Sequence, residues 1–170
     1  LLREGWQKDY FGRPPVCKTF GVGKIVDCEE LDEGRYNIML EGLHRVRLIQ
    51  EFPTGTFRTA RVQVLCDPPI DGVREQVGAL MKDIRVQCEV LVKTLPRTRG
   101  LVQAAWGAHP HPLMVANHLT ASLVIDAYDR QSILEQDDPL RRLKLLHVQL
   151  RHIIYQLQAG HVPNEVVEED

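Results

Sequence analysis

Apolar residues alternate with polar ones before residue 66, and afterwards they recur every three or four residues. Alternation is the period of a half-buried strand, whereas the longer spacing is the period of an amphipathic helix. The change falls in the segment CDPPIDG, residues 66–72, whose two prolines fit neither element. We therefore predict an α+β chain with a β subdomain at 1–69, a helical subdomain at 70–160 and an acidic tail at 161–170.

The β half is predicted to begin with a hairpin. Residues 17–30 read as a strand, the loop LDEG suits a turn because Gly34 accepts a positive φ, and RYNIMLE is the return strand. On that return strand Tyr36, Ile38 and Leu40 share one face. We expect this face to point inward.

A meander is predicted to follow the hairpin. Gly42 permits a second reversal or a bulge before RVRLIQ, where Arg45 and Arg47 alternate with apolar residues and are expected to face water. The segment FRTARVQVL, residues 57–65, reads as a further antiparallel strand. Open edges of such a sheet would invite association unless they are closed or covered.

The second half is predicted to be a bundle of helices. The first is the longest and ends at Pro96, while Asp138 and Pro139 mark the start of the last one by an N-cap and a first-turn proline. The predicted helical segments are 72–95, 98–108, 111–125, 129–136 and 139–157.

Composition narrows the classes of function. The chain of 170 residues has a formal net charge of −2, so it lacks the basic excess of a nucleic-acid binder. No apolar run is long enough to span a membrane. The four cysteines form no C-x-x-C pair and are interpreted as buried free thiols of a cytoplasmic protein.

No motif indicates a reaction or a cofactor. The segment FGVGKIV has Gly21, Gly23 and Lys24 but neither the P-loop spacing nor its Ser or Thr. The histidines at positions 109, 111 and 118 have no Cys, Asp or Glu at ligand spacing, so a loop-to-helix junction explains them better than a metal site. We predict no catalytic residue, no cofactor and no metal.

The segment REGWQKDYFGRPP, residues 3–15, is the most suggestive surface feature. Trp6, Tyr10 and Phe11 lie among charges, Gly and Pro, where a loop presents side chains to a partner. The alternative is that these aromatic side chains fold back as a lid over the core of the sheet, and this is the packing that we favour. With Phe52 they are nevertheless our candidate protein-binding residues.

The run GVGKIVDCEELDEGRYNIMLEGLHRVRLIQEF followed by FRTARVQVL resembles the N-terminal substrate-binding domain of Lon proteases. The resemblance rests on the Gly21 segment entering a strand, on Gly34-Arg35-Tyr36, on Glu41-Gly42 and on Arg45. The segment HPLMVANHLTASLVIDAYDRQSILEQDDPLRRLKLLHVQL resembles the helical half of the same family, so the likeness covers nearly the whole chain.

This resemblance implies a six-stranded PUA-like antiparallel β-barrel followed by a helical bundle. It also implies a non-catalytic, stand-alone LON domain that recognises unfolded or client polypeptide, or that serves a protease or ATPase partner, with homo-oligomers possible. One alternative is a fragment of a complete Lon protease, whose ATPase and Ser-Lys peptidase motifs do not occur in this sequence. Another is an RNA-binding PUA-like module using Arg45, Arg47, Arg58 and Arg61, which the acidic balance disfavours.

The sequence departs from the family at its start. Members of the family begin with a segment of PL-F-P-L character before the position of Leu1-Leu2, and this chain begins after it, without a methionine. We accordingly expect the barrel to lack its N-terminal strands and to expose an edge.

Overall fold

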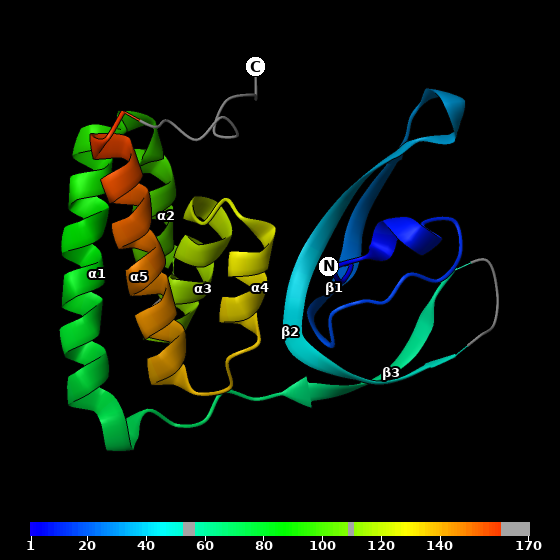
Figure 1. Cartoon of the computed structure of the whole chain (residues 1–170), viewed down its shortest axis with the longest axis horizontal. Coiled ribbons are helices and arrows are strands. Elements are labelled where there is room, and N and C mark those ends of the chain that lie inside the picture. The colour runs from blue at the N-terminus through cyan, green and yellow to red at the C-terminus, as the bar shows by residue number, and fades with distance from the viewer. Residues whose placement is uncertain (53–56, 109–110, 161–170) are drawn as a thin grey trace. The chain divides into compact units, whose positions relative to one another are not determined.

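The computed structural model describes residues 1–52, 57–108 and 111–160. The chain divides into two compact units, Leu1–Cys66 and Asp67–Asp170. In the described residues the first unit holds a three-stranded antiparallel sheet and the second holds five α-helices (Figure 1). The α+β class predicted from the sequence is therefore confirmed, whereas the predicted acidic tail lies outside the described residues.

The sheet has the strand order β1-β2-β3. Its strands are β1 (Thr19–Glu30), β2 (Tyr36–Phe52) and β3 (Thr59–Leu65). The hairpin loop between β1 and β2 turns through Glu33 and Gly34, whose φ angles are 63° and 72°, so the predicted positive φ at Gly34 is confirmed. The expected second reversal at Gly42 is wrong, because RYNIMLE and RVRLIQ are parts of the single strand β2.

Gly42 instead borders a β-bulge, the other outcome that the sequence left open. Val22 pairs with His44 and Gly23 pairs with Gly42, so Leu43 has no partner on β1. One extra residue reverses the alternation of side chains. Tyr36, Ile38 and Leu40 consequently lie on one face of the sheet, whereas His44, Val46 and Leu48, after the bulge, lie on the other.

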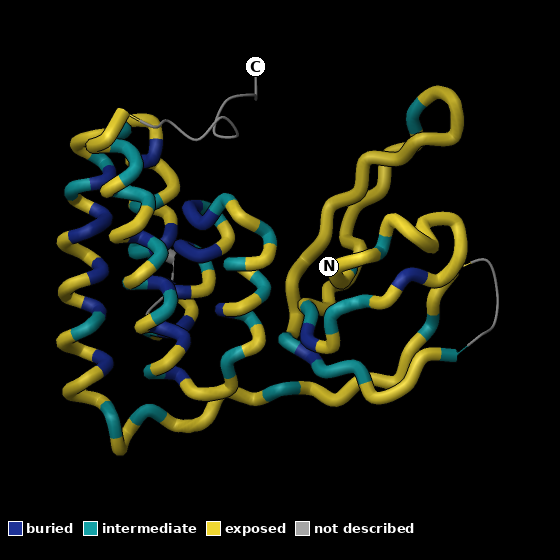
Figure 2. The backbone as a smooth tube through the Cα atoms, in the orientation of Figure 1, coloured by how far each residue is buried: buried dark blue, intermediate teal, exposed yellow. Residues whose placement is uncertain are grey.

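Between the bulge and the hairpin loop, β1 and β2 form a two-stranded ribbon, because β3 pairs only with Arg45–Phe52. The expectation that Tyr36, Ile38 and Leu40 point inward is wrong: they share a face, but their exposed fractions are 55%, 51% and 59%. No third strand or helix of the described first unit covers this face, and Figure 2 shows the ribbon as exposed along its length. Val46, after the bulge, is the fully buried residue of β2.

Two smaller expectations also need correction. Cys28 lies on the uncovered ribbon and Cys66 at the end of the sheet, and both are exposed; Cys88 alone is buried, although all four thiols are free as predicted. Arg45 and Arg47 are half-buried rather than fully in water, because they lie in the three-stranded part of the sheet.

The helical unit follows the predicted periodicity. Pro112 and Pro139 lie in the first turns of their helices, and the Asp126 and Asp138 carboxylates accept hydrogen bonds from the backbone N–H groups that open α4 and α5. The helices are α1 (Arg74–Thr94), α2 (Arg99–Ala108), α3 (Pro112–Leu123), α4 (Ala127–Leu134) and α5 (Pro139–Gln158).

One hydrophobic core holds these helices together. Helix α1 packs along α5, and α2 packs on α3 (Figure 1). The core is a continuous cluster that includes Ile84, Cys88 and Leu91 of α1 and Leu143, Leu146 and Leu150 of α5, each at most 2% exposed. Burying such side chains contributes roughly 1.5–3 kcal/mol each.

Arg142, at the start of α5, is a charged residue within this core. Its side chain is 2% exposed, and its two terminal nitrogens donate to the Asp67 carboxylate at 2.7 and 3.1 Å. Nε and Nη2 also donate to the Gln136 carbonyl at 3.2 and 2.8 Å. The guanidinium therefore joins the first residues of the helical unit to the α4–α5 loop.

Replacing Arg142 by methionine is expected to lower the free energy of unfolding by about 3 kcal/mol, because Asp67 and the Gln136 carbonyl lose their donor together. The neighbouring Arg141→Met is the matched control, since its ion pair with Asp138 spans 3.8 Å between exposed side chains. It should cost less than about 0.5 kcal/mol. Urea unfolding of the full chain, followed by helical circular dichroism, measures both. Equal midpoints for the two variants would show that the buried pair does not stabilise the unit.

Gly23 is required by the close approach of the strands at the bulge. A Cβ at this position would lie 2.7 Å from the backbone oxygen of Glu41, whereas a Cβ at Gly21 would meet nothing within 4 Å. Gly23→Ala should therefore destabilise the hairpin by about 1–3 kcal/mol and Gly21→Ala by less than about 0.5 kcal/mol. Hydrogen exchange of the β1 and β2 amides reports this local opening. Equal exchange in the two alanine variants would contradict the steric argument.

Candidate functional site

One face of the β1–β2 ribbon is an uncovered apolar surface of the first unit. Opposite residues of an antiparallel pair share a face, and the pairs Ile25–Leu40 and Cys28–Ile38 stand beside Tyr36. We call Ile25, Cys28, Tyr36, Ile38 and Leu40 the apolar ribbon face. All five residues are exposed. A contiguous apolar surface of this kind marks a site of protein interaction more often than scattered exposed residues do.

The opposite face of the ribbon is polar. It carries the cross-strand pairs Lys24–Glu41, Asp27–Met39 and Glu29–Asn37. Met39, which is 63% exposed, is the one apolar residue among these pairs. The ribbon is thus amphipathic, with most of its paired apolar side chains on one side.

The backbone of the ribbon is also open along its edges. In the described residues β2 pairs with β3 only from Arg45 onward, so Tyr36–His44 is bonded to β1 alone. Likewise, β1 pairs with no strand other than β2. Unpaired N–H and C=O groups beside an apolar face are the features that allow an extended peptide to add as a strand.

The N-terminal aromatic segment is a separate feature of the same unit. The Leu2–Val16 bridge and the hydrogen bond from Arg3 N to Pro15 O close its base. The short helix η1 (Trp6–Asp9) follows Gly5, whose φ is 84°. A second turn is held by the Asp9 carboxylate, which accepts from Arg13 N at 3.1 Å.

Within this segment the aromatic rings contact one another in series. Trp6 and Tyr10 have ring centroids 5.4 Å apart, and Tyr10 meets Phe11 edge-on at 5.1 Å. Trp6 is half-buried, but Tyr10 is exposed and Phe11 is 98% exposed. The expectation that Tyr10 and Phe11 form a lid over the core is therefore wrong. Both side chains are exposed to solvent, on a loop whose base is held by the Leu2–Val16 bridge.

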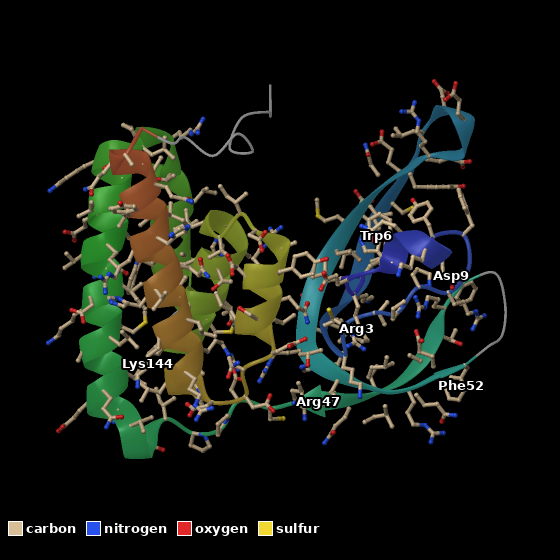
Figure 3. All side chains as sticks on the ribbon, in the orientation of Figure 1. Arg3, Trp6, Asp9, Arg47, Phe52 and Lys144 are labelled. Atoms are coloured by element: carbon tan, nitrogen blue, oxygen red, sulfur yellow. The ribbon has the colours of Figure 1, made fainter. Side chains whose placement is uncertain are left out.

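Phe52, the fourth candidate residue, does not join this aromatic series. Figure 3 shows Trp6 beside η1 and Phe52 well apart from it, at the end of β2. Phe52 is half-buried, and the Arg61 guanidinium lies 5.9 Å from its ring centroid. Its link to the segment is through the backbone, because Arg13 Nη1 donates to the Phe52 carbonyl at 3.3 Å.

The four arginines considered for RNA binding are engaged within the protein. Arg58 pairs with Glu51 and donates to the Pro14 carbonyl at 2.8 Å, while Arg61 stacks against Phe52. Arg45 and Arg47 also have partners and are half-buried. Arg58 and Arg61 therefore connect parts of the first unit, and none of the four arginines is a free cation of an open basic face.

The helical unit holds a pocket between α1 and α2 with a volume of about 440 Å³. Its apolar lining comes from Val92, Val102 and Trp106, and its cations are Arg85, Lys93 and Arg99. Arg85 lies over the Trp106 ring at 5.3 Å from the centroid, an arrangement that a cation–π interaction favours. We call this the basic pocket.

Cys88 also lines the basic pocket, but its thiol is not activated. Burial raises the pKa of the Cys88 thiol to about 11, and the negative charge of Glu89 acts in the same direction, while the nearby Trp106 indole opposes it. The residue is 1% exposed. A neutral, inaccessible thiol is a packing residue rather than a nucleophile.

The described residues contain no cluster of three or more His, Cys, Asp or Glu side chains that could hold a metal ion. His109 lies outside the described residues, and His111 uses its Nδ1 to accept from Leu113 N at the start of α3. None of the described helices is long and apolar enough to cross a bilayer.

Sequence reasoning did not identify either the apolar ribbon face as exposed or the basic pocket. The ribbon could have been recognised from Gly42, since a bulge there moves the even-numbered residues to the other face. The pocket combines Arg85 and Lys93 with Arg99 and Trp106, which come from two helices. No local spacing brings those residues together.

Comparisons with known proteins agree with this architecture. The family model described as the ATP-dependent protease La (LON) substrate-binding domain matches residues 6–152. The chain is 27% identical over 149 residues to the Lon protease of Escherichia coli K12 and 27% identical over 142 residues to that of Desulfovibrio desulfuricans. These matches cover 86% and 82% of this chain but only 19% and 16% of the relatives, so the chain spans less than a fifth of their length.

A solved structure is similar in fold. The N-terminal domain of a Mycobacterium avium complex Lon protease matches with a TM-score of 0.62 at 16% identity, covering 82% of this chain and 72% of that one. The sheet and helices described above thus have the arrangement of a Lon N-terminal domain. Together with the family match over residues 6–152, this establishes that the chain belongs to the family of LON substrate-binding domains.

Proposed function

We propose that this chain is a non-catalytic protein-binding domain that captures unfolded or extended segments of client polypeptides, as its resemblance to the recognition domain of Lon implies. The observation that carries the proposal is the apolar ribbon face, where Tyr36, Ile38 and Leu40 are each more than half exposed. Unfolded chains expose apolar side chains and unpaired backbone together, and the ribbon offers a partner for both.

The ribbon suits sequence-tolerant capture. An incoming extended segment would bond to the backbone of an open edge, independently of its sequence, while its apolar side chains lie on the apolar ribbon face. A folded protein exposes few such segments, because its strands are already paired and its apolar residues are inside. The surface therefore distinguishes unfolded from folded protein by the exposed apolar side chains and unpaired backbone of the unfolded chain.

We also propose the aromatic segment as a second contact. Tyr10 and Phe11 are large, exposed rings on a loop that is tied down at its base, which lowers the entropy lost on binding. Trp6 packs against Tyr10, and Phe52 contributes the part of its ring that Arg61 leaves uncovered.

Three finer assignments belong to the same proposal. The sheet is part of a PUA-like barrel, which is supported by the resemblance of its strand sequences to the family. The chain acts in the cytoplasm, which is supported by its four free thiols. A second copy of this chain and an ATPase–protease are the alternative partners of the ribbon.

Substitution of the ribbon tests the proposal. The double variant Ile38→Ser, Leu40→Ser should weaken binding of a fluorescently labelled, permanently unfolded protein by about tenfold or more, because it removes two central apolar contacts. Met39→Ser is the matched control on the polar face of the same strand and should change the dissociation constant by less than about twofold. Anisotropy titrations measure binding, and circular dichroism shows that the variants are folded.

The same titrations contain the results that would contradict the proposal. Equal affinity for the unfolded protein and for a folded control protein would reject capture of unfolded chains. Unchanged affinity in the double variant would remove the ribbon as the binding surface. If Ile38→Ser, Leu40→Ser instead converts a dimer to a monomer by light scattering, with binding unaltered, the ribbon is the interface between two copies.

A further inference from the structure

The basic pocket combines an apolar lining with an excess of positive charge. Arg85, Lys93 and Arg99 are three cations, and Glu89 is the carboxylate of the lining. Arg85 is shared between the Trp106 ring and Glu89, from which it lies 4.0 Å. Lys93 and Arg99 make no ion pair or side-chain hydrogen bond with another described residue. They are the charges that remain for a ligand.

The volume of about 440 Å³ is that of a site for a small group rather than for a folded domain. Val92, Val102 and Trp106 favour an apolar side chain, and the two remaining cations favour a carboxylate close beside it. Charge complementarity and lining together therefore indicate a ligand that carries an apolar group and a carboxylate a few bonds apart.

We propose that the basic pocket binds the C-terminal end of a polypeptide whose last residue is apolar. At a free C-terminus the α-carboxylate and the side chain are attached to the same Cα, which matches the proximity of cations and apolar wall in one pocket. An internal Asp or Glu places its charge on a different residue from the apolar side chain, at another angle around the chain. The choice of a polypeptide over a free carboxylic acid rests on the proposed function.

The pocket would add selectivity that the ribbon lacks. Backbone pairing and apolar contact accept many sequences, whereas a carboxylate held by Lys93 and Arg99 requires a chain end. Cys88 beneath the pocket stays neutral, since burial raises its pKa, so it adds no negative charge to repel the ligand.

The test uses short peptides that cannot occupy the ribbon. A fluorescein-labelled Gly-Ser repeat ending in leucine is titrated with the full chain as the free acid and as the C-terminal amide. Binding of the acid is expected to be stronger than binding of the amide by about tenfold or more, which is the effect of about 1.4 kcal/mol from a charge-assisted contact. The affinity of the same free-acid peptide ending in glycine should be lower by a similar factor, because glycine leaves the apolar lining unfilled.

Substitution of the two available cations completes the test. The double variant Lys93→Gln, Arg99→Gln should weaken binding of the free-acid peptide by about tenfold and leave binding of the amide unchanged. Lys82→Gln, Arg151→Gln is the matched control, because it removes the same two charges from exposed positions outside the pocket lining. Circular dichroism of both variants confirms that the helices are intact.

Four results would overturn the proposal. The first is equal binding of acid and amide, and the second is an unchanged affinity in Lys93→Gln, Arg99→Gln. The third is an amidated peptide with an internal Glu-Leu pair that binds as well as the free acid, which would assign the pocket to internal acidic segments. The fourth is a dissociation constant for N-acetyl-leucine well below that of the peptide, which would make the pocket a site for small carboxylates. Each leaves the titrations of unfolded protein on the ribbon unaffected, so the two proposals can fail separately.

Discussion

The β-bulge at Leu43 determines what the first unit presents to its surroundings. β2 carries apolar residues at most of its even positions, and in a regular strand all of them would lie on one face. Because Val22 pairs with His44 while Gly23 pairs with Gly42, the bulge divides this row. Val46 is buried under the three-stranded part of the sheet, and Tyr36, Ile38 and Leu40 are left on the other face. A single unpaired residue thus separates a buried apolar side from an exposed apolar side within one strand.

Periodicity alone could predict the elements but not this division. The hairpin loop at Gly34, the strand at 57–65 and the five helices followed from local signals that depend on neighbours in sequence. Whether Tyr36 faces inward depends on how far β3 extends along β2, and β3 stops pairing at Arg45. The exposure of Cys28 could not be predicted for the same reason, because its burial depends on whether a third strand pairs with the ribbon, and none does in the described residues.

In the helical unit, local sequence signals likewise fail to predict burial, but here a residue expected to be exposed is buried. An arginine beside Arg141 at the start of an amphipathic helix is typical of a solvated turn, yet Arg142 is buried while Arg141 is exposed. The difference arises from Asp67, which is 75 residues away in sequence and supplies the carboxylate that makes burial of the charge tolerable. The basic pocket was equally hidden, since its cations and its indole come from α1 and α2.

The two candidate surfaces differ in what they can discriminate. The ribbon depends on apolar area and open backbone, so its affinity should vary smoothly with the hydrophobicity and extension of a client. The basic pocket depends on a charge held near an apolar wall, and charged contacts reject partners that lack the matching group more sharply than apolar ones do. A domain with both kinds of surface does not need a catalytic group to be selective. If both proposals hold, the domain would hold any unfolded chain weakly and prefer chains that also present a suitable end. Arg85, engaged with Trp106, would leave Lys93 and Arg99 to the ligand.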